Sequence, residues 1–403
     1  MFRLLSIFTL FLCLVSPIFS QNQQDFTFSF PSKAFEKERT IYVHVPEVYY
    51  EKVKEPMGVI YVLDAQAPSY WNNAKSVIDY LVWSYQIMPV IVVGIHSDYR
   101  STEFMQKWTS FADNDPDNSG EAAILQQHLK EEVFPLVADS FRVNGFRAIV
   151  GHSRGGNFLM HTLFGTEKEL FNAYIALSPV MHYMENQTME EIKSSLSKKE
   201  PFHKFLFISH GNVGSGEKFY MQQSVWLDSL LQKNAPTSLP FKKEQIDGAT
   251  HFTSVAPGLV KGLIAMNQNF TVDSETMQSI LENDNKSIAS QIEKLEKDQR
   301  EKLHLFFPIK ADQYRSFAND MIDEEKYDRA IELYDLCTFH DPLNFQGYMG
   351  KAHALKEKGN IEGAKQAYDT ALEVVQSGKT WLSEKGITNW SRAITNERRM
   401  LDR

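Results

Sequence analysis

The sequence predicts a three-layer α/β sandwich around a mostly parallel sheet, followed by an all-helical domain. Apolar runs without alternation, such as residues 58–63 and 90–95, are typical of strands that are buried on both faces of a parallel sheet. Segments with helical periodicity lie between these runs, which indicates alternating strands and helices. After residue 269 the chain becomes charged and a 34-residue repeat appears, which favours a separate helical domain.

Length and charge limit the classes of function. The 403 residues are enough for two domains and a large core, and a hydrophobic content of 43% is typical of a globular chain. The formal net charge of -9 argues against a nucleic-acid partner, because phosphate binding favours a basic surface. The sequence contains neither a Walker-type phosphate loop nor histidines and cysteines with metal-ligand spacing.

The first twenty residues have the pattern of a secretory signal peptide. Arg3 gives a positive start, residues 4–15 are apolar but too few to span a bilayer, and Ser20 offers a cleavage site. We therefore expect a secreted or periplasmic protein without stable membrane insertion, with a retained anchor as the alternative. Cys13 would leave with the peptide, so Cys337 would remain as a single cysteine without an internal disulfide.

Alternating apolar residues at 26–45 predict an antiparallel hairpin at the edge of the sheet. Active sites in open sheets of this kind lie at the carboxyl ends of the strands, so we expect the catalytic residues in the loops that follow the strands. The expected strands are 58–63, 90–95, 147–150, 173–177, 204–208 and 242–246, and the expected helices are 69–83, 121–134, 157–164, 189–197, 218–233 and 254–266.

The stretch GHSRGG at residues 151–156 places Ser153 where a strand turns sharply into a helix. Glycines suit such a turn, because it strains the serine backbone and brings neighbouring chain too close for side chains. A serine in this position exposes its hydroxyl above the sheet and is the nucleophile of α/β-hydrolases. A tight turn without chemistry is the alternative.

A serine nucleophile needs a histidine base that a carboxylate holds, and in this fold the order is serine, acid, histidine. His251 follows the last expected strand and is the candidate base, whereas His210 comes too early in the order. Glu217 is the first candidate for the acid, with a helix-terminal glutamate of no catalytic role as the alternative. Asp247, four residues before His251, is the second candidate.

The tetrahedral intermediate of acyl transfer needs two backbone donors for its oxyanion. We expect one from the amide of Arg154, next after the nucleophile, and the other from Ala65 or Gln66. The Arg154 side chain would lie near the acyl group or on the helix surface. The loop 112–120 would be a flap over the site or a solvated connection.

Several motifs together resemble the putative esterase family, which includes esterase D and the enterochelin esterase-like hydrolases. The motifs are TIYV at 40–43, YVLD at 61–64, PVIVVGI at 89–95 followed by Arg100, GHSRGG at 151–156, ALSP at 176–179, and His251. The resemblance implies an α/β-hydrolase fold and a serine carboxylesterase that acts on a small-molecule ester without a metal or organic cofactor. It carries over Ser153 and His251, whereas the acid has no sharp motif. A mycolyltransferase branch shares the fold, so an acceptor other than water is also implied.

The C-terminal third is predicted to be helical, which divides the chain into a signal peptide (1–20), an esterase domain (21–270), a linker helix (271–310) and a helical domain (311–403). The linker helix is expected at 274–305, with a break near 283–285 as the alternative. In the helical domain, one set of residues recurs 34 positions later and resembles tetratricopeptide repeats. The set is Tyr327, Ala330, Tyr334 and Cys337, and its counterpart is Ile361, Ala364, Tyr368 and Ala371.

About two such repeats, at 311–377, cannot bury their faces alone. We therefore expect the linker helix and a final helix at 390–401 to cover the stack, or the stack to pack on the hydrolase. Cys337 takes a small crossing position and is assigned to packing. The repeats would bind a protein partner or mediate self-association, with a stabilising appendage as the alternative.

The sequence leaves three hypotheses for the whole chain. The first is a serine esterase that works through an acyl-enzyme, with Ser153 as nucleophile and His251 as base. The second is an acyltransferase of the same fold. The third is a catalytically inactive, hydrolase-like protein that recruits partners through its repeats.

Overall fold

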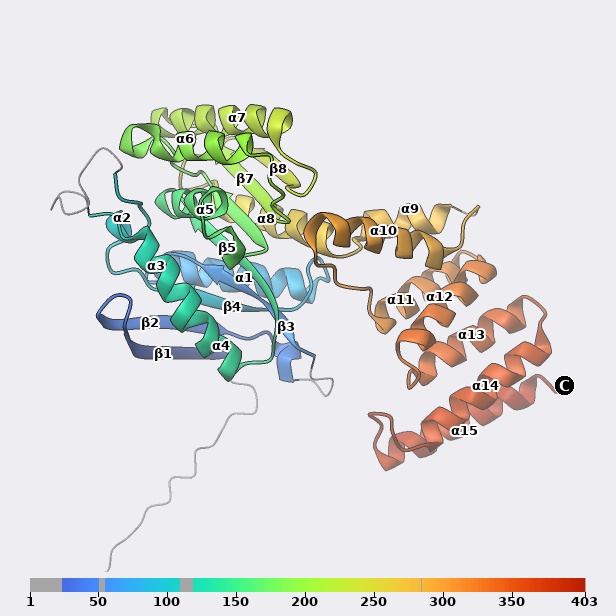
Figure 1. Ribbon diagram of the computed structural model, residues 1–403. Helices are drawn as coiled ribbons and strands as arrows, with labels where there is room; N and C mark the ends of the chain where they lie inside the picture. Colours follow the sequence, from blue (N-terminus) through green and yellow to red (C-terminus); the bar gives the residue numbers. More distant parts are fainter. Residues whose placement is uncertain (1–23, 51–54, 109–118, 284, 403) are drawn as a thin grey trace, which may run out of the picture.

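The computed structural model describes residues 24–50, 55–108, 119–283 and 285–402. In these ranges an α/β part is followed by a row of helices that extends away from it (Figure 1). The expected signal peptide, residues 1–20, lies outside the described residues. No helix in the described ranges is long and apolar enough to cross a bilayer.

An eight-stranded sheet forms the centre of the α/β part, in the order β1-β2-β4-β3-β5-β6-β7-β8. β1 and β2 form an antiparallel hairpin at one edge, β2 pairs antiparallel with β4, and the remaining neighbours are parallel. The mostly parallel sheet and the edge hairpin are therefore confirmed. The strands are β1 Asp25–Ser32, β2 Lys37–His44, β3 Met57–Val62, β4 Val90–Ile95, β5 Val143–His152, β6 Ala173–Leu177, β7 Phe205–Gly211 and β8 Phe241–Ile246.

Burial follows the sequence patterns from which the strands were predicted. Every residue of β3 and β4 is buried, as expected for apolar runs covered on both faces. β1 instead alternates between exposed and half-buried positions until its last residue, Ser32, which is buried. Its Phe26 and Phe28 rings pack edge-on against Phe141, with centroids 5.3 and 6.1 Å away, so the hairpin has one face on the core.

Helices cover both faces of the sheet and create two apolar cores. On one face, side chains of α1 and α8 such as Ile78 and Leu263 pack against the strands. On the other face, Phe158 of α5 and Leu227 of α7 belong to the second core. The helices are α1 Pro68–Trp83, α2 Arg100–Glu103, α3 Ala122–His128, α4 Phe134–Ser140, α5 Arg154–Phe164, α6 Tyr183–Ser197, α7 Ser215–Asn234 and α8 Val255–Phe270, with the short 3₁₀ helices η1 Glu47–Tyr50 and η3 Lys168–Leu170 and the π-helical segment η2 Leu129–Val133.

The predicted linker helix is divided into α9 (Ser274–Glu282) and α10 (Ile288–Leu303), so the break is present. Each half has its own N-cap: the side chain of Asp273 accepts from the Thr276 amide, and that of Ser287 accepts from the Ser290 amide. Separate caps satisfy the amides that an interruption would otherwise leave unpaired.

The end of α10 docks on the α/β part. Leu303 is buried in the same core as α8, and the Phe307 ring packs edge-on against Phe146 with centroids 5.5 Å apart. The Phe307 amide donates to the Phe270 carbonyl at 2.7 Å. Residues 303–307 therefore complete one core of the α/β part.

The C-terminal helices repeat with a fixed spacing. α11 (Ala311–Asp323) and α13 (Phe345–Glu357) begin 34 residues apart, as do α12 (Tyr327–His340) and α14 (Ile361–Gln376). The last helix, α15 (Glu384–Met400), begins six residues earlier than expected and buries Ile394 against the α14 side of the stack. Cys337 is buried in α12, and burial raises the pKa of its thiol to about 12, which suits a packing role.

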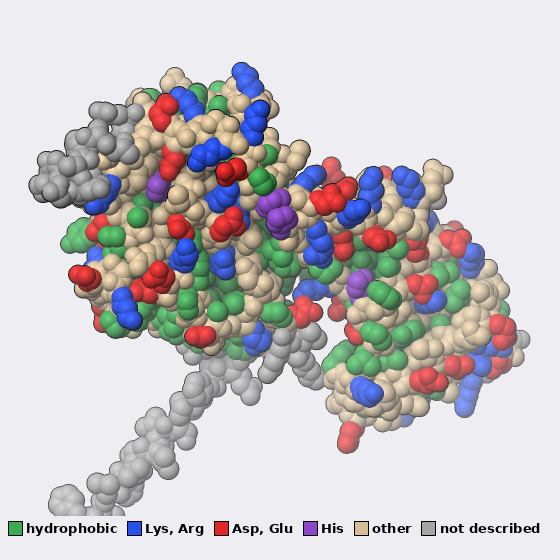
Figure 2. Space-filling view, in the orientation of Figure 1, with side chains coloured by type: hydrophobic (Ala, Val, Ile, Leu, Met, Phe, Trp, Pro, Cys, Tyr) green, Lys and Arg blue, Asp and Glu red, His purple; other side chains and the backbone are tan. Residues whose placement is uncertain are grey.

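Surface charge is mixed in sign. Figure 2 shows Lys and Arg side chains interspersed with Asp and Glu over both the α/β part and the helical part on the face in view. This face does not show an extended basic stripe, which is typical of proteins that bind phosphate backbones.

The docking of α10 makes a stability prediction. Leu303→Ala removes a side chain that is 1% exposed, and we expect it to lower the free energy of unfolding by about 2–5 kcal/mol. Leu343→Ala is the control, because Leu343 is 41% exposed and should change stability by no more than about 0.5 kcal/mol. Urea denaturation measures both, and equal effects would contradict the docking.

Candidate active site

Ser153 lies between β5 and α5 in a strained conformation, with φ 59° and ψ -114°. A non-glycine residue in such a region costs on the order of 1–3 kcal/mol and persists only where its surroundings fix it. The Ser153 amide donates to the Leu177 carbonyl at 3.0 Å, and its carbonyl accepts from the amides of Asn157 and Val180 at 3.0 and 3.2 Å. The turn predicted from the sequence is thus held by β6 and by the start of α5.

Two glycines of the GHSRGG stretch allow this turn to pack. A Cβ on Gly151 would lie 2.6 Å from the Gly155 carbonyl carbon, and a Cβ on Gly156 would lie 2.8 Å from Pro179 Cα. Both obstacles are backbone atoms, which cannot move aside cheaply. The close approach of α5 to β5 and to the loop after β6 therefore depends on the absence of side chains at these positions.

His251 and Glu217 are hydrogen-bonded to each other, Nδ1 to Oε2, at 2.8 Å. His251 lies in the turn after β8, and Glu217 in the first turn of α7. The other oxygen of Glu217 accepts from Ser178 Oγ at 2.8 Å and from the Gly211 amide. The carboxylate is thus fixed by three donors from three separate loops.

The environment of Glu217 keeps it ionised. Burial alone would raise the pKa of Glu217, whose side chain is 1% exposed. Hydrogen bonds from His251, Ser178 and the Gly211 amide outweigh burial and hold its pKa below the ordinary glutamate value. An ionised Glu217 accepts the proton on His251 Nδ1, so the hydrogen-bonding pattern assigns the lone pair of the ring to Nε2.

His152, the residue before the nucleophile, also contacts His251. Its Nε2 lies 2.9 Å from the His251 carbonyl oxygen, and its Nδ1 lies 2.7 Å from the Tyr70 hydroxyl. Because Nε2 faces an acceptor, it carries the proton, and Nδ1 accepts from Tyr70. Burial, together with the nearby His251, lowers the pKa of His152 to about 3, so it stays neutral. Sequence reasoning missed this role because the position between Gly151 and Ser153 is variable in the elbow motif.

The two expected sources of the second oxyanion donor differ in the structure. The Ala65 amide donates to the Ile95 carbonyl at 3.1 Å, so this donor is already used. The Gln66 amide takes part in no backbone hydrogen bond within the described ranges. The Gln66 side chain is fixed, since its Oε1 accepts from the Ser97 amide at 2.9 Å. Arg154 is the first residue of α5, where a backbone amide has no partner inside the helix.

An ion pair fixes the loop that carries Gln66. Asp64 is buried with φ 64°, and Arg100 donates to both of its oxygens, at 2.8 and 3.0 Å. The Gln66 Nε2 also donates to Asp64 at 3.1 Å. Asp64 and Arg100 belong to motifs recognised in the sequence, but their contact joins two loops that the sequence does not relate.

The remaining candidates lie apart from the His251 ring. Asp247, the second candidate for the acid, is exposed and accepts from Asn212 and Gln245 side chains at 3.0 and 2.6 Å. His210 is buried, and its Nδ1 lies 2.8 Å from the Gly211 carbonyl. Of the loop 112–120, residues 112–118 lie outside the described residues.

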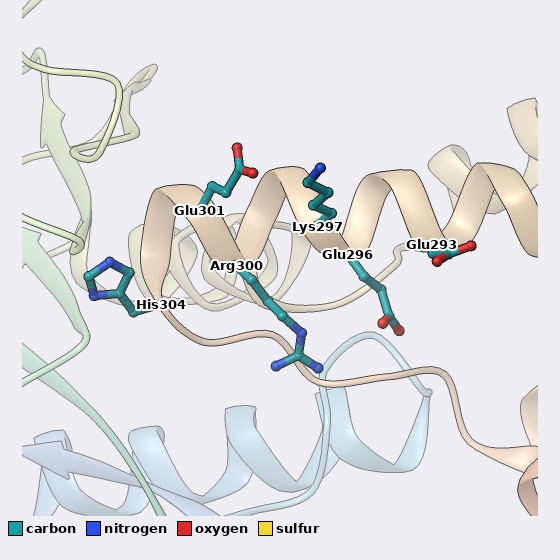
Figure 3. Close-up of a pocket in the computed structure, with 6 residues that line it drawn as sticks. All are labelled: Glu293, Glu296, Lys297, Arg300, Glu301 and His304. Atoms are coloured by element: carbon teal, nitrogen blue, oxygen red, sulfur yellow. The ribbon is translucent and has the colours of Figure 1, made fainter.

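Two hollows differ in their relation to Ser153. One, of about 160 Å³, is lined by Arg154 together with residues of α6 and of the segments around 101–108 and 119–120. The other, of about 610 Å³, runs along α10 away from the elbow, and Figure 3 shows Arg300 and Glu296 on one side of the helix and Lys297 and Glu301 on the other. Within the described ranges, no group of three or more His, Cys, Asp or Glu side chains could hold a metal ion.

A parallel sheet that presents a serine at a strand-to-helix turn is the arrangement of the α/β-hydrolases, and the fold assigns the chain to that class. The family model described as Putative esterase matches residues 32–254, which is more than half of the chain. The protein therefore belongs to this family.

Individual relatives cover different parts of the chain. The sequence is 30% identical over 112 residues to a siderophore enterobactin esterase of Emericella nidulans; the match covers 28% of this chain and 35% of that protein, about a third of its length. The fold is similar to that of an IroE-like serine hydrolase from Shewanella oneidensis, with a TM-score of 0.65, 22% identity, and 78% and 99% of the two chains covered. It is also similar to an uncharacterised protein from Capnocytophaga ochracea, with a TM-score of 0.64, 14% identity, and 93% and 100% covered. Because this similarity covers 93% of the present chain, it extends into the helices that follow residue 310.

The lowered pKa of Glu217 makes a stability prediction. A carboxylate whose pKa is depressed by folding stabilises the fold above its unfolded value, about 4.3 for glutamate, and this contribution is lost as pH falls through the folded pKa. We expect the wild type to exceed Glu217→Gln in free energy of unfolding at about pH 7 and the difference to shrink as pH falls below about 4.

Urea denaturation at several pH values measures this difference. Asp247→Asn is the control, because it removes an exposed carboxylate from the same region and should follow the wild type at each pH. A difference between wild type and Glu217→Gln that is constant with pH would contradict the assignment of an ionised, hydrogen-bonded Glu217.

Proposed function

We propose that the protein is a serine esterase in which Ser153 is the nucleophile, His251 the base and Glu217 the residue that orients it. The observation that carries the proposal is the His251–Glu217 hydrogen bond at 2.8 Å, located at the carboxyl end of the sheet where the strained Ser153 is presented. The family supports an ester substrate, and the siderophore esterase named above supports a small-molecule one.

The reaction proceeds through an acyl-enzyme. His251 Nε2 takes the proton from Ser153 Oγ as this oxygen attacks the ester carbonyl. The oxyanion of the tetrahedral intermediate accepts from the amides of Arg154 and Gln66, each of which contributes about 3 kcal/mol to its stabilisation. The intermediate then collapses, and His251 gives its proton to the departing alcohol. Water repeats the sequence on the acyl-enzyme and releases the acid.

The chain's hydrogen bonds support the roles of the supporting groups. Within the described contacts the Ser153 hydroxyl makes no hydrogen bond, so its approach to His251 Nε2 is part of the proposal. Glu217 fixes the ring, and His152 holds the His251 backbone through the carbonyl contact. Because His152 is neutral, it positions His251 without placing a second positive charge beside the base.

The ends of the chain complete the proposal. Residues 1–20 act as a cleaved signal peptide, which makes the esterase secreted or periplasmic. Residues 21–270 form the esterase domain and 271–310 the linker, while 311–403 form a tetratricopeptide-like domain that binds a protein partner or mediates self-association. The 34-residue spacing of the C-terminal helices supports the last assignment.

Labelling and kinetics test the catalytic assignment. We expect a fluorophosphonate probe to label the wild type and not Ser153→Ala, and the kcat/KM for a short-chain nitrophenyl ester to fall about 10⁴- to 10⁶-fold in this variant. Glu217→Gln should lower kcat on the order of 10⁴-fold, since the ring loses its orienting carboxylate. Asp247→Asn is the matched control and should retain wild-type kcat. Labelling or hydrolysis that does not depend on Ser153 would exclude the proposal, and product diverted from free acid by added alcohols would favour an acyltransferase.

A further inference from the structure

The proposed reaction gives no role to the Arg154 side chain. Its backbone amide serves the oxyanion, but its guanidinium lies 5.3 Å over the Tyr183 ring. Arg154 is half-buried, so part of its side chain stays exposed. Both the nucleophile and this cation are therefore presented by the same turn.

Arg154 has no anionic partner in the described part of the chain. Two other arginines near the carboxyl edge of the sheet are paired: Arg39 with Glu103 at 2.8 Å and Arg100 with Asp64 at 2.8 Å. Arg154 contacts the Tyr183 ring and no carboxylate, within the ranges that the structure describes. A partly exposed guanidinium without a counter-ion is available to an anion brought by a ligand.

The hollow beside the elbow gives such an anion a place. It measures about 160 Å³, and its lining combines the Arg154 cation, the aromatic rings of Trp108 and Tyr183, the Met105 side chain and small groups at Ser101 and Gly120. A cavity of about 150 Å³ takes up a single benzene ring, so the space suits one short chain or ring. A planar guanidinium binds carboxylates and phosphates through paired hydrogen bonds.

We infer that the preferred substrates are esters that carry an anionic group, such as a carboxylate, within a few bonds of the scissile carbonyl, and that Arg154 binds this group in the hollow. The inference rests on the proposed esterase function and names its substrate class. The anion has two sources, the acyl part or the alcohol part of the ester, and both would bring the same chemistry to the guanidinium.

Ester pairs that differ in charge test the inference. The probes are ethyl butanoate, which is neutral, monoethyl succinate, with a carboxylate in the acyl part, carboxymethyl butanoate, with a carboxylate in the alcohol part, and butyrylcholine, which is cationic. The readout is the ratio of kcat/KM for each charged ester to that for the neutral one. Because both values come from the same preparation, a partly unfolded variant does not distort the ratio.

The wild type should prefer at least one of the anionic esters, and which one it prefers identifies the source of the anion. In Arg154→Gln this ratio should fall roughly tenfold to hundredfold, the usual worth of a hydrogen bond to a charged group, whereas Arg154→Lys should retain part of it. Arg154→Glu should reverse the order and favour butyrylcholine over the anionic esters. A merely structural role of Arg154 would not reverse a charge preference.

Added salt gives a second readout without a mutation. The anionic preference of the wild type should weaken as ionic strength rises, because salt screens the attraction between partly exposed charges. Ser153-dependent hydrolysis with equal ratios in wild type and Arg154→Gln would overturn the inference and leave the esterase function intact. Absence of Ser153-dependent hydrolysis of all four esters would instead count against the esterase function itself.

Discussion

The buried carboxylate of Glu217 is the point on which the site depends. It joins the start of α7, the loop after β6 and the turn after β8, because its donors are the Gly211 amide, Ser178 and His251. Each of these loops follows a different parallel strand, and a parallel sheet brings their ends to the same edge. Loss of the charge would leave buried donors unpaired in three loops at once, which couples the geometry of the base to the stability of the fold.

Much of the fold and of the catalytic set can be predicted from sequence, since the signals are local. The continuous apolar runs identify the parallel strands, and β6 has the predicted bounds, Ala173–Leu177. Ser153, Glu217 and His251 each follow a strand in the order that the fold requires, and the structure joins the last two through a hydrogen bond.

Contacts between distant loops could not be predicted in the same way. The sequence does not distinguish Ala65 from Gln66 as the second oxyanion donor. The direction of each amide depends on the positive φ of Asp64 and on the hydrogen bond from the Ala65 amide to the Ile95 carbonyl. The Arg100–Asp64 ion pair joins residues 36 positions apart through the four-residue helix α2. The sequence predicts a later start for α15 than the structure has, although Ser383 caps the helix, since Gly386 in its first turn weakens the helical signal.

The docking of residues 303–307 also has a consequence for the order in which the protein is made. The α/β core that contains Phe146 and Phe270 is not filled until Leu303 and Phe307 arrive, and Phe307 lies 37 positions after Phe270. At a synthesis rate of about 5–20 residues per second, this delay is about two to seven seconds. During that interval the apolar surface around Phe146 and Phe270 lacks the side chains that cover it in the folded protein, and it is open to a chaperone.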